Sequence, residues 1–143
     1  MNPLDLLRVA DTLTHYTGEA EIRTVAGRAY YAVFNFIRSY LADNQIRLSN
    51  KKVHELLPLC IKNSGIEEAK EVGKKVGELG DDRIEADYEM GIEWAEDRTS
   101  LVLIKKAREA VEGFQSCRGT ALLDGVKSYL KMRCEPITWD DTT

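Results

Sequence analysis

Histidine is scarce in this 143-residue chain, which contains only His15 and His54. The Glu-x-x-His pattern of ferritin-like dimetal bundles does not occur, and neither does the His-Glu-x-x-His pattern of zinc peptidases. The Gly-x-Ser-x-Gly turn of serine hydrolases is absent as well. These absences argue against most metal centres and against a serine triad. We therefore expect a protein that uses neither a metal nor a cofactor.

Disulfide motifs, long apolar runs and an excess of positive charge are also lacking. The three cysteines lie far apart and form no Cys-x-x-Cys, which argues against a disulfide framework and fits a reducing compartment. No run of about 18 apolar residues and no signal-peptide pattern is present. The net charge of -4 disfavours a broad basic face for duplex nucleic acid and leaves room for a local cationic cleft. The expected location is cytoplasmic, without a membrane segment.

Apolar residues recur at spacings of three and four along most of the chain, which is the period of amphipathic helices. No alternating strand pattern or strong hairpin dipeptide appears. The predicted helices cover residues 3–15, 19–43, 53–60, 64–88, 93–114 and 122–130. This pattern predicts an all-α fold, an up-and-down four-helix bundle with additional short helices. We place a single domain at residues 1–134 and a flexible C-terminal tail, which carries Trp139, at residues 135–143.

Local signals predict several helix ends. Asn2 is placed to cap the first helix, and Ser64 and Glu67 have the spacing of a capping box that would start the fourth. Pro58 makes the third helix short or kinked. Three glycines fall on one side of the fourth helix: Gly73, Gly77 and Gly80. They indicate either a neighbouring helix at close approach or a kink.

The fourth helix also carries two charges along its apolar stripe. The stripe runs through Val72, Val76 and Leu79. Its next positions are Arg83 and Asp87. One interpretation is an ion pair at the edge of the core, which adds only a few tenths of a kcal/mol when exposed and can lose its net attraction when buried. The alternative is a cleft or partner surface where the planar guanidinium binds phosphate or carboxylate.

Three further polar side chains share one side of the second helix: Arg28, Tyr31 and Asn35. They form either a polar seam that fixes helix packing or the wall of a polar cleft that Arg83 also lines. In the second case they are candidates for ligand binding. His54, beside the leucines of the third helix, is either a packed, hydrogen-bonded residue or part of such a site.

Several elements occur in a characteristic order. Ala-Gly-Arg-Ala-Tyr-Tyr-Ala-Val-Phe spans residues 26–34, His54 follows, and Arg-x-x-Ala-Asp-Tyr spans residues 83–88 before Ala95-Glu96 and a closing helix. Over residues 19–114 this arrangement resembles the HEPN family, most closely the branch with an Arg-x-x-Ala-Asp-Tyr motif. That motif is the more specific element of the resemblance.

The resemblance implies a small bundle that dimerises and occurs in prokaryotic toxin–antitoxin and anti-phage systems, often beside a minimal nucleotidyltransferase. Many members are metal-independent RNases with an Arg-x4-6-His motif, of which Arg83 would be the arginine. This chain departs from that motif, because no histidine follows Arg83 and the positions four and five residues later are Asp87 and Tyr88. Asn35 also stands where related sequences in this branch often carry histidine.

Cleavage of RNA through its 2′-hydroxyl requires a base, an acid and charge stabilisation at the phosphate. Arg83 would supply the last. Asp87 can accept a proton, but the arginine one turn away stabilises its charged form and makes it a poor acid. Tyr88 can donate a hydrogen bond, and His54 would supply the missing imidazole if the third helix folds over the cleft. These four residues are the candidates for catalysis.

Two functions follow. The first is an RNase-like toxin or anti-phage effector that acts as a homodimer and cleaves RNA without metal at an Arg83-centred cleft. The second is a non-catalytic HEPN module that binds nucleotide, RNA or a partner protein, such as a nucleotidyltransferase-type antitoxin or another defence-system protein. Retention of Arg83, Asp87 and Tyr88 favours the first, and the missing histidine favours the second. We adopt the first as the working hypothesis.

Overall fold

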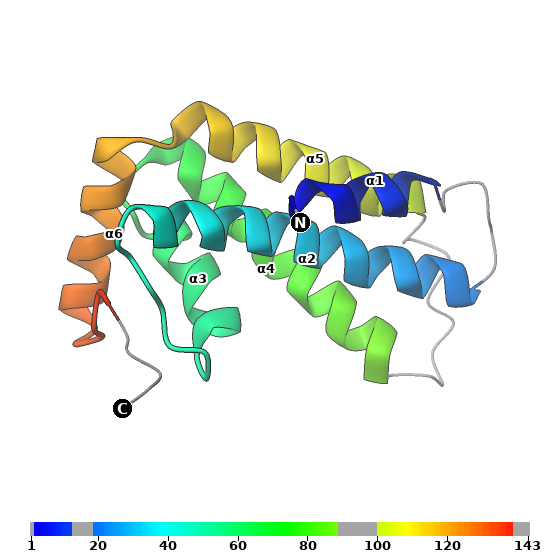
Figure 1. Cartoon of the computed structure of the whole chain (residues 1–143), viewed down its shortest axis with the longest axis horizontal. Coiled ribbons are helices and arrows are strands. Elements are labelled where there is room, and N and C mark those ends of the chain that lie inside the picture. The colour runs from blue at the N-terminus through cyan, green and yellow to red at the C-terminus, as the bar shows by residue number, and fades with distance from the viewer. Residues whose placement is uncertain (1, 13–18, 89–99, 139–143) are drawn as a thin grey trace.

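The computed structural model describes residues 2–12, 19–88 and 100–138. In these ranges the chain forms six helices and no named strand, which confirms the all-α prediction (Figure 1). The helices are α1 (Leu4–Thr12), α2 (Glu19–Asp43), α3 (Val53–Lys62), α4 (Glu67–Tyr88), α5 (Ser100–Cys117) and α6 (Thr120–Met132). The three longest, α2, α4 and α5, build the body of the bundle, and the shorter helices cover its sides and one end.

Helix α2 is the central element. α1, α4 and α5 all pack against it, and in Figure 1 it runs through the middle of the bundle. Its sequence alternates small and large apolar residues around most of its circumference, so it buries side chains toward several neighbours at once. The fully buried residues include Val25, Ala26, Ala29, Ala32, Val33 and Ile37. The observed bounds match the predicted range of 19–43.

Helix α4 packs against α2, α3 and α5. Its contact with α3 depends on Gly73, where an added Cβ would lie 2.5 Å from the Lys62 backbone nitrogen and 2.7 Å from the Pro58 carbonyl oxygen. No side chain fits at these distances, so Gly73 allows the two backbones to meet, which is the first of the two predicted alternatives at this position. One turn later the helices have separated, because a Cβ at Gly77 would meet no atom within 4 Å.

The start of α4 corrects one prediction. The helix begins at Glu67, and the buried Ser64 hydroxyl donates a 2.9 Å hydrogen bond to the Ile61 carbonyl near the end of α3. Gly65 then takes a φ of +86°, a left-handed conformation that favours glycine. The capping-box interpretation of Ser64 is therefore wrong, because this serine helps to end α3 and does not start α4.

Helices α5 and α6 complete the core. The described part of α5 starts at Ser100, and the predicted start near residue 93 lies outside the described residues. α5 buries Leu103, Ala107, Ala110 and Phe114, and α6 buries Leu122, Val126, Tyr129 and Leu130. α6 packs on α3 across the end of the bundle (Figure 1).

The chain is fixed near both ends of the described range. The Asn2 Oδ1 accepts a 3.0 Å hydrogen bond from the Leu4 amide, which confirms the predicted cap of α1. Farther along, the Arg47 amide donates to the Ile137 carbonyl at 2.9 Å, and the Thr138 hydroxyl donates to the Gln45 carbonyl at 3.0 Å. Residues 135–138 of the predicted tail are thus paired with the α2–α3 connection.

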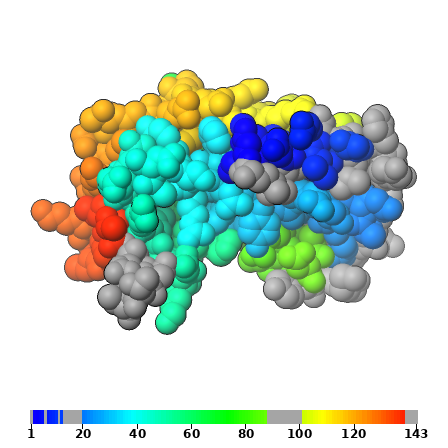
Figure 2. Space-filling model, in the orientation of Figure 1, coloured from blue at the N-terminus to red at the C-terminus, as the bar shows by residue number. Residues whose placement is uncertain are grey.

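The rest of that predicted tail, residues 139–143 with Trp139, lies outside the described residues. An ion pair of 2.8 Å between Lys52 and Glu135 adds a side-chain contact between residues 135–138 and the α2–α3 connection. In the space-filling view the outline of the molecule is indented between α3 and the C-terminal half of α4, below α2 (Figure 2).

Candidate functional site

Arg83 lies where α4 meets the aromatic residues of α2. Its side chain is only 16% exposed. Its guanidinium carbon lies 5.3 Å from the centre of the Tyr30 ring and 5.5 Å from the centre of the Tyr31 ring. Such cation–π contacts stabilise by about 0.5–2 kcal/mol each. The two rings hold the guanidinium beside the buried seam of α4, as the sequence predicted.

The predicted ion pair between Arg83 and Asp87 is present, but it is too weak to explain why an arginine lies at this partly buried position. The Nη1–Oδ2 distance is 3.6 Å, and the Asp87 side chain is 48% exposed. A pair of this kind stabilises by about 0–1 kcal/mol. Within the described residues the buried Arg83 Nε has no hydrogen-bond partner, and an unsatisfied buried donor costs about 1–3 kcal/mol. Fold stability is thus a weak explanation for an arginine at this position.

Arg23 fixes the end of α4 that carries this site. Its buried side chain donates through Nη1 to the Glu85 carbonyl at 3.1 Å and to the Ala86 carbonyl at 2.9 Å. Carbonyls in the last turn of a helix have no partner within the helix, so Arg23 satisfies two of them. The contact holds α4 against α2 within one turn of Arg83. No sequence signal distinguished Arg23, because a long-range side-chain contact leaves no local pattern.

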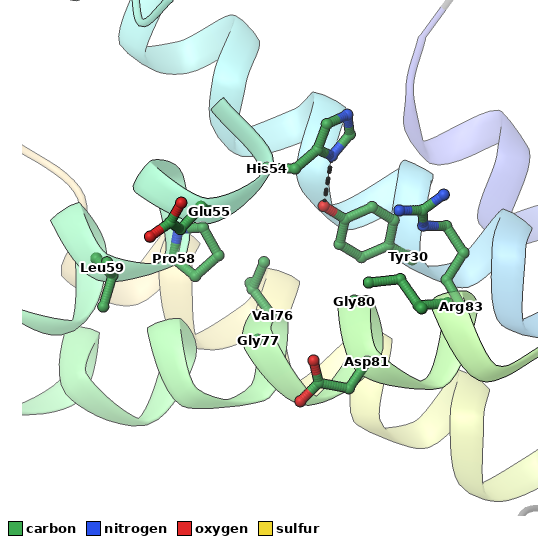
Figure 3. A pocket seen from close by; sticks show the side chains of 11 residues that line it. Tyr30, His54, Glu55, Pro58, Leu59, Val76, Gly77, Gly80, Asp81 and Arg83 are labelled. Atoms are coloured by element: carbon green, nitrogen blue, oxygen red, sulfur yellow. Dashed lines mark hydrogen bonds between the residues drawn. The ribbon is translucent and has the colours of Figure 1, made fainter. Parts of the chain in front are cut away.

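His54 meets the same aromatic cluster from the first turn of α3. Its Nδ1 lies 2.8 Å from the Tyr30 hydroxyl (Figure 3). Its ring stacks on Phe34, with the ring centres 4.5 Å apart and the planes 12° from parallel. The third helix therefore does fold over the site, which was the condition for His54 to take part. Tyr30 touches both His54 and Arg83 and so links the two.

The surroundings shift the proton affinities of both linked groups. Burial raises the pKa of Tyr30 to about 12, with the Arg83 charge acting in the opposite direction. Partial burial lowers the pKa of His54 below its ordinary value of 6.5, and the positive charges of Arg83 and then Arg38 lower it further. The phenol therefore keeps its proton near neutral pH, and the imidazole is uncharged.

A pocket of about 460 Å³ connects these side chains, and we call it the Arg83 pocket. Its lining residues come from α2, α3 and α4: Tyr30, His54, Glu55, Pro58, Leu59, Val76, Gly77, Gly80, Asp81, Arg83 and Ile84. In Figure 3 Tyr30, His54 and Arg83 lie toward one end, and Pro58 and Leu59 lie toward the other. The structure thus brings two of the predicted catalytic candidates to one pocket.

A second depression of about 370 Å³, which we call the Asn35 hollow, lies along α2. The predicted ligand-binding residues Arg28, Tyr31 and Asn35 line it together with Asp87. Arg83 is not among its lining residues, although its guanidinium contacts the Tyr31 ring. The three residues therefore line one hollow, but it is not the predicted cleft shared with Arg83, which contacts Tyr31 without lining the hollow.

Some site residues were missed from the sequence and one stays undescribed. Tyr30 and Phe34 belong to the 26–34 motif, but neither was a candidate for binding or catalysis. Their spacing of four on α2 places both rings on the face that α3 covers, and this is the signal that could have marked them. Tyr88 belongs to α4, but its side chain lies outside the described part of the structure.

Two general features bear on the possible chemistry. Within the described residues no group of three or more His, Cys, Asp or Glu side chains is placed to hold a metal ion. The same part of the chain has no helix long and apolar enough to cross a membrane.

Comparison with known proteins identifies the family. A family model described as the HEPN domain matches residues 10–116, from α1 to the end of α5. The protein belongs to the HEPN domain family. An uncharacterized protein of Methanocaldococcus jannaschii is 39% identical to this HEPN protein over 61 residues, which is 41% of this chain and 37% of the relative. The match thus covers little more than a third of that relative's length. No solved structure matches this chain significantly.

Proposed function

We propose that this HEPN protein is an RNase-like toxin or anti-phage effector that cleaves RNA without metal at the Arg83 pocket. The observation that carries the proposal is that Arg83 and His54, from different helices, line one pocket and both contact Tyr30. An arginine and an imidazole at one pocket are the groups of the family's Arg-x4-6-His motif. In this proposal His54 of α3 takes the role of the histidine that α4 lacks.

Arg83 would bind the scissile phosphate. Its guanidinium is held in place by two aromatic rings, so little side-chain entropy is lost when an anion binds. A planar fork of N–H donors fits two phosphate oxygens at once. The same fixed charge would stabilise the extra negative charge that develops as the phosphodiester is attacked.

His54 would accept the proton of the ribose 2′-hydroxyl. Its lowered pKa keeps the ring neutral near pH 7. In the tautomer whose Nδ1–H donates to the Tyr30 oxygen, the lone pair is on Nε2, and the ring accepts a proton there. Tyr30 then orients the base. The proton for the leaving 5′-oxygen would come from Tyr88 or water, and Asp87 would act beside Arg83 as a proton acceptor.

The remaining parts of the proposal rest on the family resemblance. They are the branch with the Arg-x-x-Ala-Asp-Tyr motif, the role in toxin–antitoxin or anti-phage defence, and a partner such as a minimal nucleotidyltransferase. The active form would be a homodimer, with the Asn35 hollow of each subunit extending the surface for RNA. Sedimentation velocity on the purified protein tests the dimer directly.

The alternative is a non-catalytic HEPN module that binds nucleotide, RNA or a partner protein through the same surface. One observation favours it. The imidazole of His54 comes from α3 and Arg83 comes from α4, so this pair differs from the family's arginine and histidine on one helix. The His54 ring is also hydrogen-bonded to Tyr30. In this reading Arg83 binds a phosphate and no bond is broken.

Cleavage of labelled total RNA and transfer RNA in EDTA distinguishes the two. Wild type is compared with Arg83→Ala, His54→Gln, Asp87→Ala and Tyr88→Phe. Arg118→Ala is the matched control, because Arg118 makes the same kind of contact with the Tyr40 ring, at 5.5 Å, and does not line the pocket. Loss of a charge-stabilising group costs roughly 100- to 1000-fold in rate, and loss of a general base about 100- to 10000-fold.

We expect wild type and Arg118→Ala to cleave and Arg83→Ala and His54→Gln to lose that activity. A lower rate in Tyr88→Phe would assign the acid, and a lower rate in Asp87→Ala would show that Asp87 takes part in the reaction. Absence of cleavage by folded wild type, with RNA binding that Arg83→Ala abolishes, would replace the nuclease by the binding module.

A further inference from the structure

The Arg83 pocket extends well beyond the groups that the proposed chemistry uses. Its volume of about 460 Å³ is in the range of small-molecule sites, about 300–1,000 Å³. Arg83 and His54 lie toward one end, while Pro58, Leu59 and Val76 make the remainder apolar (Figure 3). A phosphate alone would leave this apolar part empty.

The apolar part exists because α3 and α4 diverge. They touch at Gly73, where an added Cβ would lie 2.5 Å from the Lys62 nitrogen. At Gly77 an added Cβ would meet nothing within 4 Å, and Gly77 lines the pocket. In the described structure, packing therefore does not require a glycine at position 77. Glycine inside a helix nevertheless costs about 1 kcal/mol of stability relative to alanine. What its missing side chain provides is space in the pocket.

Two carboxylates stand at the rim of this space. Asp81 projects from α4 and Glu55 from the first turn of α3, and both side chains are exposed (Figure 3). Among the described residues, Asp81 makes no hydrogen bond or ion pair. Carboxylates only accept hydrogen bonds at neutral pH. The pocket thus combines apolar lining with two carboxylates that can accept hydrogen bonds from N–H groups.

We propose that this part of the pocket is a base subsite for a guanine nucleotide unit whose phosphate binds Arg83. The inference rests on the proposed function and names its substrate class. Guanine presents an N1–H and an amino group side by side, which together fit one carboxylate. Uracil presents a single N–H between two carbonyl oxygens, and those oxygens are repelled by Asp81 and Glu55. The base would lie between Pro58 of α3 and the surface that Gly77 leaves open on α4.

Calorimetric titration with 3′-GMP, 3′-AMP, 3′-CMP, 3′-UMP and ribose 5-phosphate tests the subsite. A bidentate contact to one base discriminates by roughly tenfold or more, so we expect 3′-GMP to bind at least about tenfold more tightly than 3′-UMP. Ribose 5-phosphate should bind more weakly than 3′-GMP. Asp81→Asn should reduce the preference for guanine, and Arg83→Ala should weaken all five ligands.

Gly77→Leu is the decisive variant, because it fills the open space and replaces glycine by a better helix former. It should reduce 3′-GMP binding to the level of ribose 5-phosphate, with Gly77→Ala in between. Ala121→Leu, an exposed position of α6 outside the pocket, is the matched control and should bind like wild type. Circular dichroism confirms that each variant is folded.

Equal binding of the four nucleotides, binding unaffected by Gly77→Leu, or no nucleotide binding at millimolar concentration would each overturn the base subsite. Other outcomes would overturn the proposed function without overturning the subsite, or the reverse. RNA cleavage without a guanine preference would retain the nuclease and remove the subsite. Guanine-selective binding that depends on Gly77, without any cleavage, would retain the subsite in a binding module.

Discussion

The Tyr30 hydroxyl lies 2.8 Å from His54 Nδ1, and this contact joins α2 to α3 at the edge of the Arg83 pocket. The rings of both residues also contact Phe34. The pair therefore serves packing and the proposed chemistry at the same time, and a change to either residue should be visible in both.

Tyr30→Phe removes this hydrogen bond and keeps the ring against which Arg83 packs. We expect the free energy of unfolding, measured with urea, to fall by about 1 kcal/mol, the usual net value of a hydrogen bond. Tyr31→Phe is the control, because within the described residues no hydrogen bond to the Tyr31 hydroxyl is seen. Equal effects of the two substitutions would show that the Tyr30–His54 contact is not formed in solution.

His54 should make stability depend on pH in one direction. Its folded pKa is below the unfolded value of 6.5, so between these two values the unfolded chain binds more protons. The free energy of unfolding should thus decrease as the pH falls through this window and be independent of His54 above it. Urea titrations of wild type and His54→Gln over about pH 4.5–8, a range that brackets the ordinary histidine pKa, compare the two slopes.

Arg38 supplies part of the charge that lowers this pKa. Its guanidinium hydrogen-bonds Asn50 and lies 5.9 Å from the centre of the Phe34 ring. Arg38→Gln should move the pKa of His54 upward, as read from its imidazole protons by NMR, and Arg118→Gln should leave it unchanged. A pKa at or above 6.5 in the wild-type protein would contradict the arrangement.

Gly73 and Gly77, one turn apart on α4, should respond in opposite ways to alanine. Gly73→Ala forces a methyl group into the α3 backbone and should destabilise by roughly 1–3 kcal/mol. Gly77→Ala adds a methyl group in open space and should stabilise by up to about 1 kcal/mol. Thermal unfolding of both variants measures this difference, and a loss of stability at Gly77 would mean that α3 and α4 stay in contact there.

Cys60 should report global unfolding. It is fully buried, and burial raises its pKa to about 12, so almost no thiolate is present near neutral pH. The exposed Cys134 should react quickly with a thiol reagent, and Cys60 only when the protein unfolds. Labelling followed by mass spectrometry at increasing urea concentrations measures both, and fast modification of Cys60 in the native protein would rule out its burial.

The helices could be predicted because their signals are local. Apolar residues recur at spacings of three and four between Glu19 and Asp43, and the observed helix α2 has these same bounds. Arg83 could be found because a charge on an apolar stripe is anomalous by itself. Ser64 was misassigned because the same serine can start one helix or end another, and the bond to Ile61 depends on how α3 terminates.

The rest of the site depends on how helices meet. Nothing in the sequence around residue 54 says that α3 will place its first turn on Phe34, so the joint position of His54 and Arg83 was only conditional. The three glycines of α4 look alike in the sequence. They differ because Gly73 touches α3, Gly80 faces the Tyr30 ring and Gly77 opens into the pocket.

The pairing of residues 135–138 with the α2–α3 connection has a consequence for the order of folding. It joins Arg47 to Ile137 and Thr138, which are far apart in sequence. Contacts of large sequence separation form late, because a long loop must close first. During synthesis, α1 to α5 can assemble before this segment has emerged. The connection that leads into His54 would then be the last part of the Arg83 pocket to be fixed.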